Sequence, residues 1–190
     1  DTLSLATENI REIAAYAADV FRYYDPNEPE DYRGCNEIFD KICQLHNVDY
    51  IYAIKPDVEK RNEEYLATGN GENTAVNIHE IRDAGYVAEG TLTDDEIKAF
   101  EGDTNGVVTH EISLYGDTLI CYMPVTGYFD SKAATMVNDK ILSIVGVELS
   151  VDIVISRFYQ RFFGFSLATV LIQVALVSAI TITLFFKVSK

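Results

Sequence analysis

Cysteine is scarce in this sequence. Three cysteines occur among 190 residues, and none stands in a Cys-x-x-Cys pair. Cys35 and Cys43 lie on an expected helix, about 12 Å apart along its axis, which is too far for a disulfide. Zinc sites built on paired cysteines are excluded by the same spacing. We therefore expect Cys35, Cys43 and Cys121 to be buried, small apolar side chains.

Positive charge is also scarce. Fifteen basic residues stand against 30 acidic ones, giving a net charge of −15, and every acidic residue lies at or before Asp152. Neutralising nucleic-acid phosphates or an anionic lipid surface requires clustered Lys and Arg. The acidic part of the chain is therefore not a nucleic-acid-binding domain.

Charge of either sign is absent from Phe162 to Phe186. This run is longer than the roughly 20 helical residues that cross about 30 Å of bilayer hydrocarbon, and it is apolar on all sides. We predict a transmembrane helix over residues 166–186, with a helix buried in a protein core as the alternative. Two basic residues flank each end, so charge leaves the orientation undecided.

The rest of the chain divides around this segment. We predict an extramembrane domain over residues 1–155, which includes a helix over 1–24, then a juxtamembrane helix over 156–165 and a short segment, 187–190, beyond the span. About 150 residues suffice for one domain with its own core. The sequence does not begin with Met, and we expect it to be part of a larger, receptor-like protein.

Catalytic and metal-binding patterns are missing. The two His-Glu pairs, at His79 and His110, lack the second histidine four positions after the first that a zinc protease helix needs. A calcium-like run from Glu101 has Ile112 where a bidentate Glu belongs. We expect no metal, no cofactor and no enzyme active site in these residues.

The N-terminal helix carries an apolar residue every three or four positions, at Leu3, Ala6, Ile10, Ile13, Ala17, Val20 and Tyr24. This seam is typical of a helix that packs along another helix. It predicts a homodimer formed through the N-terminal helix, or packing on the helix's own domain as the alternative.

The remaining pattern predicts an α+β fold, with a five-stranded antiparallel sheet, long helices on one face and an irregular cover on the other. A second helix precedes a short aromatic strand, and Thr93 and Glu96 form a capping box for a short helix in the cover. A hairpin follows, and residues 128–140 are expected to connect it to the last strand. The expected strands are 48–54, a strand within 63–73 that is closed by the Gly-Asn-Gly turn at 69–71, 107–115, 118–127 and 141–149.

Alternation along the strands assigns the two faces of the sheet, because neighbouring side chains point opposite ways. The helix-covered core face receives Ile51, Ala53, Ile112, Leu114, Leu119, Cys121, Met123, Val125, Val145, Val147 and Leu149. The opposite face receives Tyr50, Tyr52, Thr109, Glu111, Ser113, Ile120, Tyr122, Ile144 and Gly146. Aromatic, hydroxyl and carboxylate groups beneath a cover are typical of a small-molecule pocket.

The predicted ligand contacts are Tyr52, Glu111 and Tyr122 on the sheet, with Tyr65, Arg82 and Tyr86 from the second strand and the cover. Tyrosines enclose a small molecule and donate hydrogen bonds, and Arg82 is able to bind a ligand carboxylate through two hydrogen bonds. The alternatives are ordinary core packing for the tyrosines and a surface ion pair for Arg82.

Three strings, VDYIYAIKPD, YGDTLICYMPVTG and ILSIVGVELSVDIV, resemble the extracytoplasmic PAS-like sensor domains of bacterial receptors, the Cache or PDC family with a single module. The resemblance covers roughly residues 1–165. It differs at Glu148, where the family pattern has Asp.

The resemblance implies a ligand-sensing domain outside the cell membrane. A histidine kinase, diguanylate cyclase or chemoreceptor module would follow in the cytoplasm. A module for dimerisation without a small ligand is the alternative.

The last predicted strand leads directly toward the membrane segment, so we predict signal transmission through Gly146, Glu148, Ser150 and Asp152. Gly146 has no side chain and permits close approach on the pocket face. Ser150 is placed to cap the following helix, and Asp152 favours the positive end of that helix.

Overall fold

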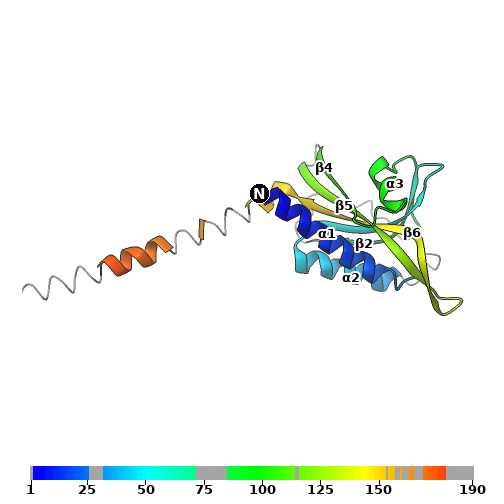
Figure 1. Cartoon of the computed structure of the whole chain (residues 1–190), viewed down its shortest axis with the longest axis horizontal. Coiled ribbons are helices and arrows are strands. Elements are labelled where there is room, and N and C mark those ends of the chain that lie inside the picture. Colours follow the sequence, from blue (N-terminus) through cyan, green and yellow to red (C-terminus); the bar gives the residue numbers. More distant parts are fainter. Residues whose placement is uncertain are drawn as a thin grey trace, which may run out of the picture. The chain divides into compact units, whose positions relative to one another are not determined.

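The computed structural model describes residues 2–25, 32–71, 85–113, 116–152, 154–156, 159, 163–164 and 169–178. It divides into two compact units, residues 1–152 and 153–190 (Figure 1). The first unit contains every strand and the three named helices.

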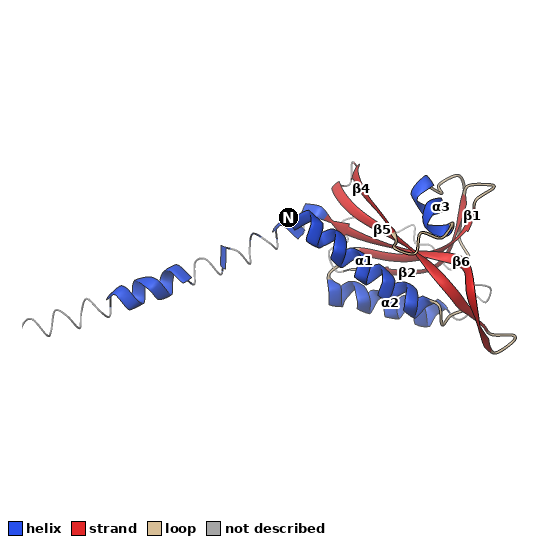
Figure 2. Cartoon of the chain, in the orientation of Figure 1, coloured by secondary structure: helices blue, strands red, loops and turns tan. Residues whose placement is uncertain are grey.

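The first unit has a single antiparallel sheet in the order β3-β2-β1-β6-β5-β4. The helices α1 and α2 lie on one face of the sheet, and the short helix α3 packs on β4, β5 and β6 (Figure 2). The predicted α+β architecture is confirmed, with one strand more than expected, because the two-residue β3 pairs with the edge of β2. The elements are α1 (Thr2–Phe21), α2 (Tyr32–His46), β1 (Tyr50–Asp57), β2 (Asn62–Asn70), β3 (Val87–Ala88), α3 (Asp94–Phe100), β4 (Val107–Ser113), β5 (Gly116–Asp130) and β6 (Thr135–Ser150).

The apolar seam of α1 packs on the chain's own sheet. Ala6, Ile10, Ile13 and Ala17 are all buried, and α1 packs mainly on β5 and β6. The buried stripe also contains Ala14, Ala18 and Phe21, so it is wider than the narrow seam of a two-helix coil. Packing on the helix's own domain is therefore the correct one of the two interpretations for these buried residues.

The predicted core face is confirmed except near one hairpin. Ile51, Cys121, Val145 and Val147 are completely buried, whereas Ile112 is 82% exposed. Ile112 lies on the predicted strand, near the end of the edge strand β4. It is exposed because α1 packs on β5 and β6 and not on this part of β4. Leu114 lies outside the described residues.

The three cysteines are free and buried, as expected. Burial raises the pKa of the Cys43 and Cys121 thiols to about 12. These thiols therefore remain protonated and unreactive at neutral pH.

Residues 128–140 do not form the expected connection. They continue β5 and begin β6, with Tyr128 opposite Val137 and a tight turn at 131–134. The end of α1 supports this long hairpin, because Asp25 accepts hydrogen bonds from the Ser131 amide (2.9 Å) and hydroxyl (2.8 Å). The prediction failed because this support comes from a distant part of the chain.

The helix α2 is held closely against β2. A Cβ atom on Gly69 would lie 2.4 Å from the carbonyl carbon of Phe39, so only glycine permits this separation. Asn36 and Asp40 of α2 accept hydrogen bonds from the outward-facing amides of Thr68 (2.9 Å) and Asn70 (2.8 Å). The α2–β2 contact is thus both a steric fit and a pair of hydrogen bonds.

The second unit is described only in part. Residues 169–178 are helical and uncharged, and their larger apolar side chains are exposed. Within the part of the chain that the structure describes, no helix is long and apolar enough to cross a membrane. Residues 166–168 and 179–186 of the predicted span lie outside that part, and so do several positions of the predicted juxtamembrane helix. Both segments stay predictions.

We predict that Gly69→Ala lowers the free energy of unfolding by about 3 kcal/mol, because the added methyl group forces α2 away from β2. Urea unfolding of the whole chain measures this change. Gly34→Ala is the matched control: its Cβ would meet only the Tyr24 hydroxyl, at 3.7 Å, and alanine is the better helix former by up to about 1 kcal/mol. Equal stability of the two variants would contradict the account of α2 packing.

Candidate functional site

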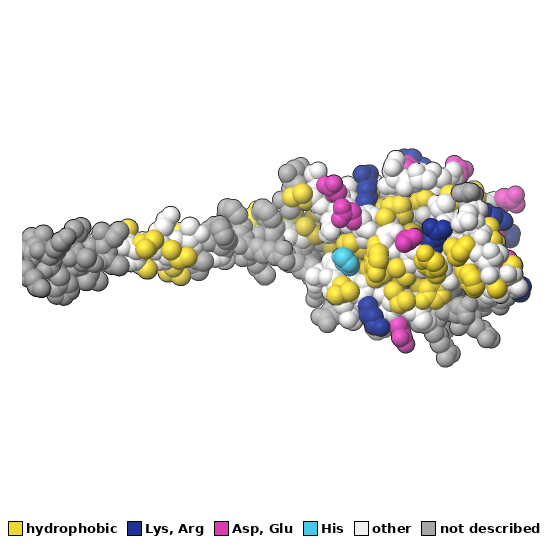
Figure 3. Space-filling model, turned by 60° about the horizontal axis from the view of Figure 1, so that its bottom comes forward, with side chains coloured by type: hydrophobic (Ala, Val, Ile, Leu, Met, Phe, Trp, Pro, Cys, Tyr) yellow, Lys and Arg dark blue, Asp and Glu magenta, His cyan; other side chains and the backbone are white. Residues whose placement is uncertain are grey.

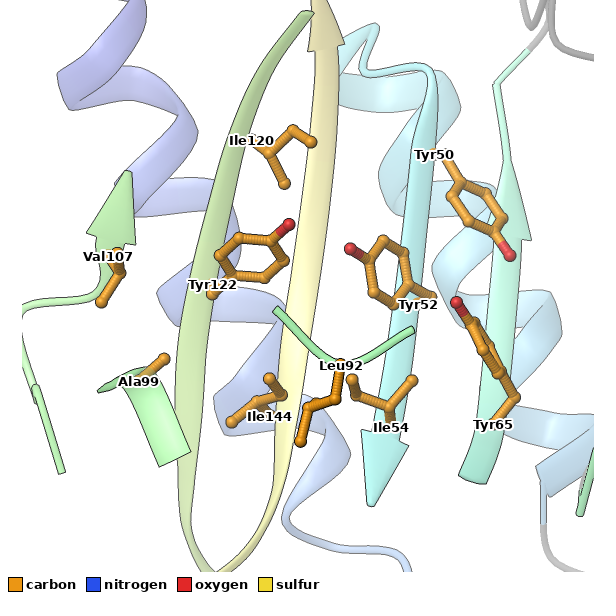
Figure 4. Packing of buried hydrophobic residues seen from close by; sticks show 10 residues of the cluster. All are labelled: Tyr50, Tyr52, Ile54, Tyr65, Leu92, Ala99, Val107, Ile120, Tyr122 and Ile144. Atoms are coloured by element: carbon orange, nitrogen blue, oxygen red, sulfur yellow. The ribbon is translucent and has the colours of Figure 1, made fainter. Parts of the chain in front are cut away.

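Two tyrosines meet over a glycine in the middle of the sheet. Tyr52 of β1 and Tyr122 of β5 are both paired with Gly146 of β6, which lies between them. Their hydroxyl groups point toward each other (Figure 4), and Tyr122 accepts a hydrogen bond from Tyr52. A Cβ atom on Gly146 would lie 2.3 Å from Cζ of Tyr52. The predicted close approach at Gly146 is therefore confirmed, and the approaching group is the Tyr52 ring.

Further tyrosines extend this cluster across β2. The ring centroids of Tyr50 and Tyr52 are 5.2 Å apart, those of Tyr52 and Tyr65 are 5.9 Å apart, and those of Tyr65 and Tyr86 are 6.3 Å apart. Tyr65 is buried, but Tyr86 is 47% exposed. The predicted residues Tyr52, Tyr65 and Tyr122 thus lie together on one face, and Tyr86 marks the rim.

The cover over this face is attached to the turn between β1 and β2. Leu92 donates a backbone hydrogen bond to the Arg61 carbonyl (3.1 Å), and Arg61 also forms an ion pair with Asp94. Leu92 and Ala99 are buried and belong to the same packed cluster as the tyrosines (Figure 4). The sequence pattern predicted the capping box of α3, and Thr93 and Glu96 form it. It did not identify Leu92 as the residue that covers the sheet.

Two buried carboxylates adjoin the tyrosines, and neither was predicted as a site residue. Glu96 of α3 is 3% exposed and Glu63 of β2 is 4% exposed. The Glu63 carboxylate accepts a hydrogen bond from the Tyr65 hydroxyl (2.8 Å), and the Glu96 carboxylate accepts hydrogen bonds from the Thr93 amide and hydroxyl (2.7 Å each). A signal existed in the sequence, since Glu63 lies two positions before Tyr65 and therefore shares its face.

Burial and mutual repulsion determine the protonation of this cluster. Burial, with smaller contributions from Glu63 and Glu111, raises the pKa of Glu96 to about 7. Burial likewise raises the pKa of Tyr52 and Tyr122, and Glu96 and Glu148 add to that effect. Near pH 7 the site therefore holds neutral phenols and one carboxyl group that is partly protonated.

Two further contacts were predicted, Glu111 and Arg82. Glu111 is exposed on β4 and acts on the cluster electrostatically. Arg82 lies outside the described residues. A cavity of about 510 Å³ opens beside the site, at the turn between β1 and β2, and its wall includes Phe100, which also packs against the tyrosine cluster.

The strand under the tyrosines is also the last strand of the sheet. Gly146 and Glu148 lie in β6, which ends at Ser150, and helical residues begin at Val151. The Ser150 amide donates a hydrogen bond to the Asp49 carboxylate (2.5 Å). Direct passage from strand to helix is therefore confirmed, whereas capping by Ser150 and the role of Asp152 stay predictions. Among the described residues no three His, Cys, Asp or Glu side chains are grouped to hold a metal ion.

The structural neighbours of this chain include the sensor domain of DcuS from Escherichia coli. It is 13% identical, with a TM-score of 0.49, and the match covers 82% of this chain and 98% of the neighbour. The ligand-binding domain of the chemoreceptor Tlp3 from Campylobacter jejuni, in complex with L-valine, is 9% identical with the same TM-score, and 81% of this chain covers 59% of it.

Both neighbours are sensory domains. No family model and no curated protein sequence matches the chain. At these identities and TM-scores the likeness carries no argument about this chain, so the proposed function rests on this chain's own residues.

We predict that the stability of the first unit falls as the pH rises from about 4.5 to about 7, by on the order of 3 kcal/mol for Glu96 alone. The buried carboxyl group is protonated in the folded protein up to about pH 7, whereas in the unfolded chain it ionises near its usual 4.5. The folded state therefore binds the proton more tightly than the unfolded chain does. The stability that this binding contributes is lost as the pH rises through that range.

Glu96→Gln keeps the capping side chain and removes the charge, so it should stabilise the protein at pH 8 and have little effect at pH 5. Urea unfolding of the whole chain at both pH values measures this difference. Asp95→Asn, in the same turn but less buried, is the control. A pH dependence unchanged by Glu96→Gln would contradict the burial of this charge.

Proposed function

We propose that this chain is the extracytoplasmic ligand-sensing domain of a bacterial transmembrane signalling receptor. A small molecule binds on the tyrosine face beneath α3, and the change passes along β6 into the helix that begins at Val151. One observation supports this most. Gly146, which is paired with both Tyr52 and Tyr122, lies on β6, four positions before that strand ends at Ser150. The binding face and the exit from the sheet are parts of one strand.

The tyrosine face suits a small ligand that has both an apolar body and polar groups. Aromatic rings supply contact area at little entropic cost, and their hydroxyls fix orientation. The buried carboxylates Glu63 and Glu96 attract an amino group, and Arg82 remains the proposed partner of a ligand carboxylate. The Leu92 side chain lies over the sheet beside Ile54 and Ile144 (Figure 4), in the same packed cluster as the tyrosines, so a ligand on this face must displace or move it.

In this proposal residues 166–186 cross the membrane and residues 187–190 lie in the cytoplasm. The acidic unit is then outside the cell. The output module, a histidine kinase, a diguanylate cyclase or a chemoreceptor signalling domain, belongs to the cytoplasmic part of the receptor. These residues bind and transmit, and they have no catalytic role.

We predict that at least one small metabolite raises the unfolding temperature of the whole chain in detergent micelles. The panel should contain L-valine and other amino acids, putrescine and succinate. Tyr122→Phe should weaken binding of the active compound about tenfold, because it removes a hydroxyl that contacts the ligand. Calorimetric titration measures the affinity.

Tyr16→Phe is the matched control, since the Tyr16 ring is 54% exposed on α1. Two results would contradict the proposal: no compound changes the unfolding temperature, or both tyrosine variants change affinity equally.

A second function, dimerisation through α1, is supported by the outer face of that helix. Leu5 and Tyr16 are 66% and 54% exposed, and their spacing of 11 places them on one side of α1. Tyr23, in the turn that follows the helix, is 63% exposed. Hydrophobic side chains form a band on the helix-covered side of the first unit (Figure 3). The proposed dimer contact therefore uses this outer face, because Ile10 and Ile13 are occupied within the chain.

We predict that the double variant Leu5→Ser, Tyr16→Ser lowers dimer affinity at least tenfold without changing the unfolding temperature, since both side chains are exposed. Sedimentation velocity in micelles measures the association. Val58→Ser, at an exposed turn, is the control. A wild-type chain that is monomeric at all concentrations would refute the dimer.

A further inference from the structure

Asp49 joins three segments of the first unit at the start of β1. Its amide donates a hydrogen bond to the Glu148 carbonyl (2.9 Å), and its carbonyl accepts one from the Gly71 amide (2.8 Å). Its carboxylate accepts the hydrogen bond from the Ser150 amide (2.5 Å). One residue therefore contacts the end of β2 and the end of β6 at the same time.

The end of β2 and the end of β6, which Asp49 joins, are followed by different parts of the chain. Gly71 immediately precedes residues 72–84, which lead to the cover over the tyrosines. Ser150 immediately precedes the helix that begins at Val151. Gly71 lies directly against this junction, since a Cβ atom there would be 2.2 Å from the Val48 carbonyl oxygen. Asp49 is thus hydrogen-bonded both to the residue that follows β2 and to the last residue of β6.

The Asp49 carboxylate accepts a hydrogen bond from an amide that the regular β1–β6 pairing leaves without an acceptor. Regular pairing between β1 and β6 ends with Tyr50 opposite Glu148, so the Ser150 amide lies beyond the first residue of β1. A side-chain oxygen from the preceding residue extends the ladder by one bond. Bonds between a backbone amide and a carboxylate are stronger than neutral ones, and unlike main-chain bonds they can be removed by a single substitution.

We propose that Asp49 is the positioning residue that fixes where β6 ends and transmits a change at the tyrosine face to the exit helix. This inference rests on the proposed function, since it names the residue that couples the site to the output. Asp49 immediately precedes β1, and Tyr52 lies three positions after it, so a shift of β1 under the ligand moves the carboxylate that holds Ser150. Coupling of this kind is measurable as a non-additive effect of two substitutions.

Amide hydrogen exchange at Ser150 in the whole chain tests the positioning role. Asp49→Ala should speed this exchange at least tenfold, and Asp49→Asn should restore it to within about threefold of wild type, because the amide oxygen still accepts a hydrogen bond. Asp103→Ala is the control: Asp103 also accepts a backbone amide hydrogen bond, from Asn105, but in a different turn. Unchanged exchange in Asp49→Ala would overturn the positioning role.

A double-mutant cycle with Tyr122→Phe tests the coupling without any ligand. In the presence of Asp49, Tyr122→Phe should change Ser150 exchange by threefold or more, and in the Asp49→Ala background this change should disappear. No change in the first background, or an equal change in both, would overturn the coupling. Failure of the ligand panel would refute the sensing function by itself, so the two failures are distinguishable.

Discussion

The contact between the Tyr52 ring and the main chain of Gly146 is the constraint on which the cover face depends. A Cβ atom at position 146 would lie 2.3 Å from Cζ of Tyr52, so a larger residue there would clash with the ring. Because the ring lies close over Gly146, its hydroxyl reaches the Tyr122 hydroxyl across β6, and Leu92 and α3 pack against the same cluster. The absence of a side chain on Gly146 thus determines how closely the tyrosine cluster approaches the sheet.

The two faces of the sheet serve opposite physical purposes. The helix-covered face is filled by aliphatic side chains, and a glycine of β2 lets α2 approach it closely. Burial of these side chains supplies the hydrophobic free energy that keeps the unit folded. The other face buries phenols and two carboxylates, which are costly to desolvate unless hydrogen-bonded. The hydrogen bonds that Glu63 and Glu96 accept offset part of that cost, and the raised pKa of Glu96 indicates that the compensation is incomplete.

The order of elements and the division into two faces were predictable, because strand alternation has a period of two and depends on sequence alone. Tyr52, Tyr122 and Gly146 were assigned to one face for this reason. Alternation tells which side a residue faces, but not whether another element covers it, so Ile112 was wrongly placed in the core. The buried Glu63 and Glu96 were missed because the burial of a carboxylate depends on neighbours distant in sequence. The long β5–β6 hairpin was missed because Asp25, near the end of α1, holds its turn.

The hydrogen bonds that α2 makes to β2 also limit how copies of this protein can associate. An open strand edge can accept a strand from another molecule, which is the usual route to domain exchange and fibril growth. At Thr68 and Asn70 the outward amides of β2 are already bound by Asn36 and Asp40. Templated growth of the sheet is therefore blocked along this stretch of β2, even where the protein is highly concentrated.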